Sequence, residues 1–147
     1  MSFYVKKIVW EYGEKFGDVF YPNNILDLKE KIKELDLLGR KKNYPFLISL
    51  VLDDQNISLS FTVGHRYSLI EFIYDRSGPI YIFNPEGNEN EHIDFYYWAS
   101  HSVADTNKMI FQEKVLEAIY YFIENKMFPL FIKLDDDEAN KQWVSDT

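Results

Sequence analysis

The most informative part of the sequence is QEKVLEAIYYFIENKMFPLFIKL, residues 112–134. Residues 112–125 repeat apolar side chains at the spacing of an amphipathic helix. The apolar side of this helix carries Val115, Ala118, Ile119 and Phe122. Pro129 cannot continue a helix, and the apolar residues 130–134 behind it predict a last strand. A helix followed by a closing strand predicts a layer of helices packed on a sheet.

The N-terminal part predicts a strand pair and a second helix. Residues 3–12 alternate in polarity like a strand, and residues 19–21 predict a short return strand. A helix should follow, because apolar residues recur at helical spacing at Ile25, Leu28, Ile32, Leu35 and Leu38. We expect Asn23 or Asn24 to cap its start and Gly39 to end it.

The centre of the chain predicts a meander. Strands are expected at residues 46–52, 57–63, 67–74, 79–83 and 92–98. The turns at 53–56 and 75–78 are too short for helical crossovers, so neighbouring strands should be antiparallel. Residues 84–90 and 99–109 carry no regular pattern and are expected to be loops.

Together these segments predict an α+β fold. We expect an antiparallel, meander-like sheet of about five to seven strands, with two α-helices packed mainly on one face. Residues 1–134 should form a single domain, since no linker or internal repeat divides them. Residues 135–147 are polar and acidic, and are expected to be a flexible tail.

The composition is that of a folded protein, because 46% of the 147 residues are hydrophobic and 18% are aromatic. The absence of cysteine excludes disulfides and thiolate metal sites. The first residues, MSFYVKK, lack the apolar segment of a secretory signal, and no apolar run is long enough to span a membrane. We therefore expect a soluble protein of the cytoplasm.

The chain is strongly acidic, with a formal net charge of −8 from 16 basic and 24 acidic residues. Such a surface repels nucleic acid and anionic membranes, so neither is expected as a partner. It attracts a basic protein, although an acidic surface also serves solubility alone.

No metal site is expected. The histidines His65, His92 and His101 match no spacing of known ligand sets. Strand alternation puts His92 and Asp94 on one face but leaves His101 in a predicted loop.

No enzymatic activity and no cofactor are expected either. Carboxylate pairs such as Asp53 and Asp54 lie in predicted turns, where acidic residues are common. The sequence has no glycine-rich phosphate loop, and none of its serines lies in a nucleophile elbow.

One acidic and aromatic segment is a candidate for protein binding. Residues 86–94 contain four carboxylates and no lysine or arginine, and aromatic residues follow directly. The predicted partner-binding residues are Glu86, Glu89, Glu91, Asp94, Tyr96 and Trp98. The carboxylates would speed association with a basic partner, and an aromatic side chain would anchor it. The alternative is a solvated loop beside aromatic residues that cover the second side of the sheet.

Residues 46–134 resemble the first-numbered Imm family of immunity proteins, which are antidotes to bacterial polymorphic toxins and often to nucleic-acid deaminases. The resemblance lies in the order of elements: an apolar strand ending in acidic turn residues, an alternating strand, and a strand into a glycine-containing turn. A variable loop, the helix around VLEA at 115–118 and a basic residue before Pro129 then follow. The chain departs from the family at Leu134, where many members have tryptophan.

The resemblance implies a cytoplasmic immunity protein that binds a cognate toxin, a deaminase or nuclease, one to one and covers its active site or substrate groove. Family members vary in their inhibitory residues, so the resemblance assigns no residue here. The alternatives are a small ligand-binding or enzymatic α+β domain and a protein-interaction adaptor that inhibits nothing.

Overall fold

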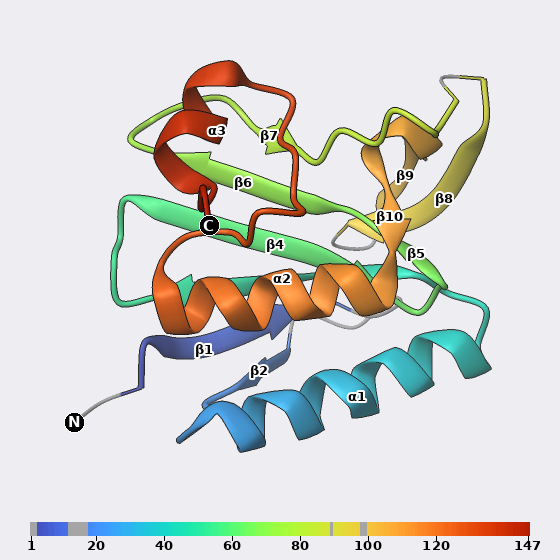
Figure 1. Ribbon diagram of the computed structural model, residues 1–147. Helices are drawn as coiled ribbons and strands as arrows, with labels where there is room; N and C mark the ends of the chain where they lie inside the picture. The colour runs from blue at the N-terminus through green and yellow to red at the C-terminus, as the bar shows by residue number, and fades with distance from the viewer. Residues whose placement is uncertain (1–2, 12–17, 89, 98–99) are drawn as a thin grey trace.

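The fold is α+β, with helices packed on an open, mainly antiparallel sheet (Figure 1), which confirms the predicted fold class. The computed structural model describes residues 3–11, 18–88, 90–97 and 100–147. The helices within these residues are α1 (Ile25–Lys41), α2 (Gln112–Asn125), α3 (Asp137–Trp143) and the short 3-10 helix η1 (Thr106–Lys108). The strands are β1 (Val5–Trp10), β2 (Asp18–Phe20), β3 (Phe46–Leu52), β4 (Ile57–Val63), β5 (Tyr67–Ser68), β6 (Ile70–Tyr74), β7 (Ile80–Tyr81), β8 (His92–Tyr97), β9 (Ser100–Asp105) and β10 (Ile110–Phe111).

Within the described residues the main sheet has eight strands, more than the sequence predicted. Six of them follow the order β2-β1-β3-β4-β6-β7, and each neighbouring pair is antiparallel. Strands β8 and β9 form an antiparallel hairpin that joins β3 through one parallel pair, Phe46 with Tyr96. A separate two-stranded sheet pairs β10 with β5.

One hydrophobic core lies between the sheet and the helices. Figure 1 shows α2 and α3 in front of the sheet and α1 along its β1–β2 end, and buried residues of α1 and α2 belong to the same core. Alternate residues of the central strands point into this core, and α1 and α2 each present one apolar stripe to it. Fully buried residues include Phe46, Ile48, Leu59, Phe61, Leu28, Ile32, Ile119 and Phe122. Each such side chain contributes roughly 1.5–3 kcal/mol of transfer free energy.

The sequence predicted that Gly39 ends α1, which is wrong. Gly39 lies buried within the last turn of this helix. The helix continues to Lys41, and Gly39 lies where it meets Gly64, the residue after β4. A Cβ atom at Gly39 would stand 2.8 Å from the Cα atom of Gly64 and 3.1 Å from the carbonyl oxygen of Tyr44. The glycine therefore permits close packing of helix on strand rather than a helix end.

The predicted closing strand at residues 130–134 is wrong. The amide of Ile132 donates to the carbonyl oxygen of Pro129 (3.0 Å), which closes a turn where a strand was expected. Isolated bridges join Phe128 to Val144 and Leu134 to Ile82. Residues 130–134 thus cross the helix-covered side of the sheet as an irregular segment with two buried anchors, Ile132 and Leu134.

The segment after residue 134, predicted to be a flexible tail, contains α3 and packs on the core. The Asp136 carboxylate caps this helix by accepting from the amide of Ala139 (2.9 Å). The ring of Trp143 lies 5.3 Å from that of Phe72 and 5.5 Å from that of Tyr74. The acidic run therefore serves as a helix N-terminus, where negative charge is favourable.

Two predictions for the middle of the chain are also corrected. The predicted loop at 99–109 contains β9 and η1, and the predicted strand at 67–74 is divided at Leu69. The division arises because β5 leaves the main sheet to pair with β10. Among the described residues, no helix is long and apolar enough to cross a membrane.

The contact between Gly39 and Gly64 gives a test of the fold. Gly39→Ala should lower the free energy of unfolding by about 1–3 kcal/mol, because its Cβ overlaps backbone that cannot move alone. Gly78→Ala is the matched control, since a Cβ at Gly78 meets nothing within 4 Å. Urea unfolding measures both changes. Equal midpoints for the two variants would contradict this account of the helix–strand contact.

Candidate partner-binding surface

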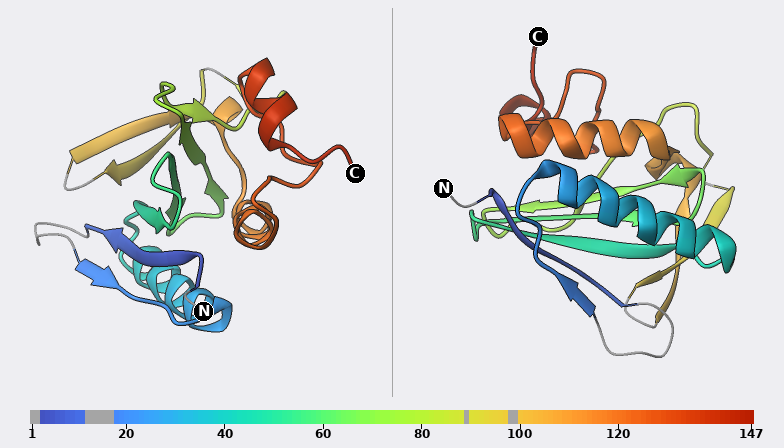
Figure 2. Two further views of the ribbon diagram at one scale, coloured as in Figure 1. Left: turned by 90° about the vertical axis from the view of Figure 1, so that its left-hand side faces the viewer. Right: turned by 90° about the horizontal axis from the view of Figure 1, so that it is seen from below.

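The β8–β9 hairpin lies on the side of the sheet opposite α2 and α3, as the left view of Figure 2 shows. It attaches through a second, smaller core. Ile93 and Phe95 of β8 and Ala104 of β9 pack there with Leu47 and Met109. The strand register places His92, Asp94 and Tyr96 on the other face of the hairpin, opposite His101, Val103 and Asp105.

The two histidines of the hairpin each pair with a carboxylate of the other strand. The Nδ1 atom of His92 lies 2.7 Å from Oδ1 of Asp105, and Nε2 of His101 lies 3.4 Å from Oδ1 of Asp94. In the described part of the chain, no three His, Asp or Glu side chains are grouped as metal ligands would be. The predicted site residue Asp94 is thus exposed and paired with a histidine.

The predicted site residue Tyr96 is half-buried. Its ring stacks on that of Tyr44, with centroids 3.9 Å apart and planes 4° from parallel. Its amide donates to the carbonyl oxygen of Pro45 (2.9 Å). These contacts attach the hairpin to β3, so much of the ring already has an intramolecular role. A partner contact by Tyr96 stays a prediction.

Glu86 and Glu91 come together at an open cavity of about 330 Å³, which we call the acidic cavity. Its lining residues are Tyr67, Asn84, Glu86, Gly87, Glu91, Thr106, Met109, Ile110 and Phe111. Both glutamates are exposed. The remaining predicted site residues, Glu89 and Trp98, lie outside the described residues.

The loop that carries Glu86 is fixed by its own polar side chains. The Asn84 side chain donates to the carbonyl oxygen of Met109 (2.9 Å) and accepts from the amide of Glu86 (3.0 Å). The Thr106 hydroxyl donates to the carbonyl oxygen of Asn88 (3.0 Å) and accepts from its amide (2.8 Å). The Asn84 side-chain amide and the Thr106 hydroxyl are used in these bonds. The carboxylates of Glu86 and Glu91 remain available to a ligand.

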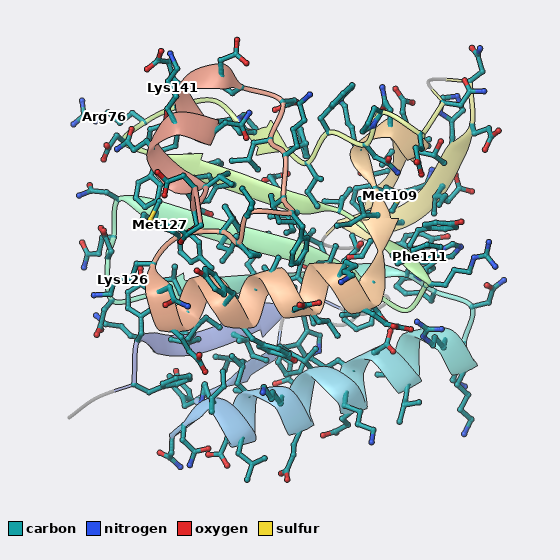
Figure 3. The ribbon with its side chains drawn as sticks, in the orientation of Figure 1. Arg76, Met109, Phe111, Lys126, Met127 and Lys141 are labelled. Atoms are coloured by element: carbon teal, nitrogen blue, oxygen red, sulfur yellow. The ribbon has the colours of Figure 1, made fainter. Side chains whose placement is uncertain are left out.

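An aromatic pair, which the sequence did not reveal, forms one wall of the acidic cavity. Tyr67 and Phe111 face each other in the β5–β10 pair, and their rings stack with centroids 5.1 Å apart. Phe111 is 56% exposed. Figure 3 shows Met109 and Phe111 on the segment that enters α2, at the opposite end of this helix from Lys126. Phe111 stands four residues before Val115, so helical spacing alone would place it with the apolar side of the helix, and the pattern gives no sign of its exposed position.

A polar junction of Asp36, Arg40, Gly64 and Gln112 holds this wall in place. The Gln112 side chain, 5% exposed, donates to Asp36 Oδ1 (2.6 Å) and accepts from Arg40 (2.8 Å). The amide of Gly64 donates to the same Asp36 oxygen (2.8 Å). The junction therefore ties α1, the end of β4 and the start of α2 together.

His65 follows the junction and leads into β5. Its Nδ1 accepts from the amide of Tyr67 (3.0 Å), which helps place the aromatic wall. Burial lowers the pKa of His65, and the nearby charges of Arg40 and Arg66 lower it further. The surroundings thus favour the neutral form of His65, which can accept the hydrogen bond from the Tyr67 amide.

Comparisons with known proteins gave no match to a family model, to a curated protein or to a solved structure.

Proposed function

We propose that this chain is an immunity protein that binds a bacterial toxin acting on nucleic acid, a deaminase or nuclease, and covers its active site or substrate groove. The observation that carries the proposal is an unbalanced acidic surface. Within the described ranges, no lysine or arginine forms an ion pair with Glu86, Glu91, Asp94 or Asp105. The resemblance in the order of elements supports the same function.

Electrostatics gives the physical reason. A toxin that holds DNA or RNA presents a basic groove to the phosphates. Carboxylates gathered on the cavity and the adjoining hairpin would attract that groove and speed encounter. The exposed ring of Phe111 would supply the desolvated anchor that charges alone do not give. Such an antidote has no substrate, and it acts in the cytoplasm, where the toxin would otherwise reach the cell's nucleic acid.

A second candidate function is small-molecule binding or catalysis in the acidic cavity. The cavity itself favours it, because two carboxylates and an aromatic wall could hold a cationic ligand. Of the other polar side chains there, Asn84 and Thr106 hold the loop, and the Tyr67 hydroxyl accepts from Arg66 (3.1 Å). The geometry of the cavity is therefore better suited to binding a partner than to catalysing a reaction.

Co-expression tests the proposed function. Cells that express the toxin domain encoded beside this gene should grow when the chain is also expressed, because the complex removes active toxin. A catalytically inactive toxin domain gives the control for expression burden. Equal killing with and without the chain would contradict the immunity function.

Association kinetics test the acidic surface. The triple variant Glu86→Gln, Glu91→Gln, Asp94→Asn should slow association with the toxin by about tenfold at low salt. Dissociation should change less, and the difference from the unmodified chain should shrink as salt screens the charges. These rates are measured by stopped-flow mixing at two ionic strengths.

The matched control carries Glu30→Gln, Asp75→Asn and Glu124→Gln, three exposed carboxylates outside the cavity and hairpin. It makes the same change in net charge. If both triple variants slow association equally, net charge rather than this surface steers the encounter, and the interface lies elsewhere.

A further inference from the structure

Several aromatic rings of the chain, two of them exposed, lie under cations of the chain itself. The ammonium of Lys114 lies 4.9 Å from the ring centroid of Phe131, and that of Lys133 lies 5.2 Å from the centroid of Phe83. Arg66 lies 4.9 Å from the centroid of Tyr67. Cation–aromatic contact is thus a repeated feature of this chain, at distances where the attraction is effective.

Phe111 differs from these rings. One face stacks on Tyr67, yet the side chain remains 56% exposed. Among the described residues, no lysine or arginine lies over its ring. Its second face is therefore open to a cation from outside.

Two carboxylates lie in the same cavity as this open ring. Glu86 and Glu91 come from the two ends of the loop fixed by Asn84 and Thr106, so the loop presents both at one place. In the part of the chain that the structure describes, neither has a basic partner. Met109, which is buried, and Ile110 add apolar lining between the acidic loop and Phe111.

We infer that the acidic cavity binds an arginine side chain of a basic protein partner. The guanidinium is planar, so it stacks on the Phe111 ring while its N–H groups donate to Glu86 and Glu91. Its methylene stem packs along Ile110 and Met109. Lysine has a compact, strongly hydrated ammonium that stacks less well, so arginine is the preferred occupant.

This inference rests on the proposed function for the identity of the partner as a toxin, but the cavity can be tested without the toxin. The probe is the peptide acetyl-Gly-Arg-Gly-amide, added to the ¹⁵N-labelled full chain and followed by NMR. Amide shifts should concentrate at Met109, Ile110 and Phe111, with affinity in the millimolar range. The same peptide with citrulline, which is nearly isosteric but neutral, should bind at least about fivefold more weakly.

Variants of the chain give the second part of the peptide-binding experiment. Phe111→Ala and the pair Glu86→Gln, Glu91→Gln should each weaken binding of the arginine peptide by about fivefold or more. The controls are Phe131→Ala, an exposed ring already covered by Lys114, and the pair Glu30→Gln, Glu124→Gln. The glutamine pair removes no packed atom, so it decides the outcome if Phe111→Ala disturbs the fold.

Shifts that are absent at about 100 mM peptide, scattered over the surface, or equal for arginine and citrulline would overturn the inference. If the peptide fails in this way while the chain still neutralises the toxin, the cavity is wrong and the immunity function stands. If the peptide binds in the cavity while the toxin still kills, the cavity stands and its partner is another basic protein.

Discussion

The Asp36 carboxylate is the interaction on which the candidate surface depends. It accepts hydrogen bonds from the Gly64 amide (2.8 Å), the Gln112 side chain (2.6 Å) and Arg40 Nε (3.0 Å). The Asp36 side chain is only 15% exposed, so its charge is largely removed from water. Losing one of the three donors therefore lowers the stability of the fold. Three elements far apart in sequence are thereby fixed at one point. From that point β5 and β10 run side by side, and their pairing stacks Tyr67 on Phe111.

The parts of the fold that could be predicted are those where the apolar pattern alone determines the element. The helices at 25–41 and 112–125 and the strands β3 and β4 each present a regular apolar face to the core. The prediction for residues 130–134 failed because an apolar run after a proline suits a strand as well as a turn in which only Ile132 and Leu134 are buried. Helix α3 was missed because its place is set by Trp143 packing on Phe72, a contact distant in sequence.

The sequence gathered the acidic residues into one predicted surface, and the structure divides the described ones between two places. Glu86 and Glu91 line the acidic cavity, whereas Asp94 lies on the hairpin beside His101. Tyr96 stacks on Tyr44, and the open ring at the cavity, which the sequence did not predict, belongs to Phe111. Strands β5 and β10 have two residues each, too few to show any periodicity, so their pairing leaves no trace in the sequence. The site is thus an acidic loop joined to an aromatic wall that tertiary structure builds.

Amide hydrogen exchange in Gln112→Leu tests most directly whether the Asp36 junction holds that wall. Leucine keeps the size and helix propensity of glutamine but removes both side-chain hydrogen bonds. The account predicts about tenfold or greater loss of protection at the amides of Gly64 and of position 112, which donate to Asp36 and Arg66, with little change at Leu50 and Leu59 in the central strands. Unchanged protection at Gly64 and position 112, or an equal loss throughout the sheet, would contradict it.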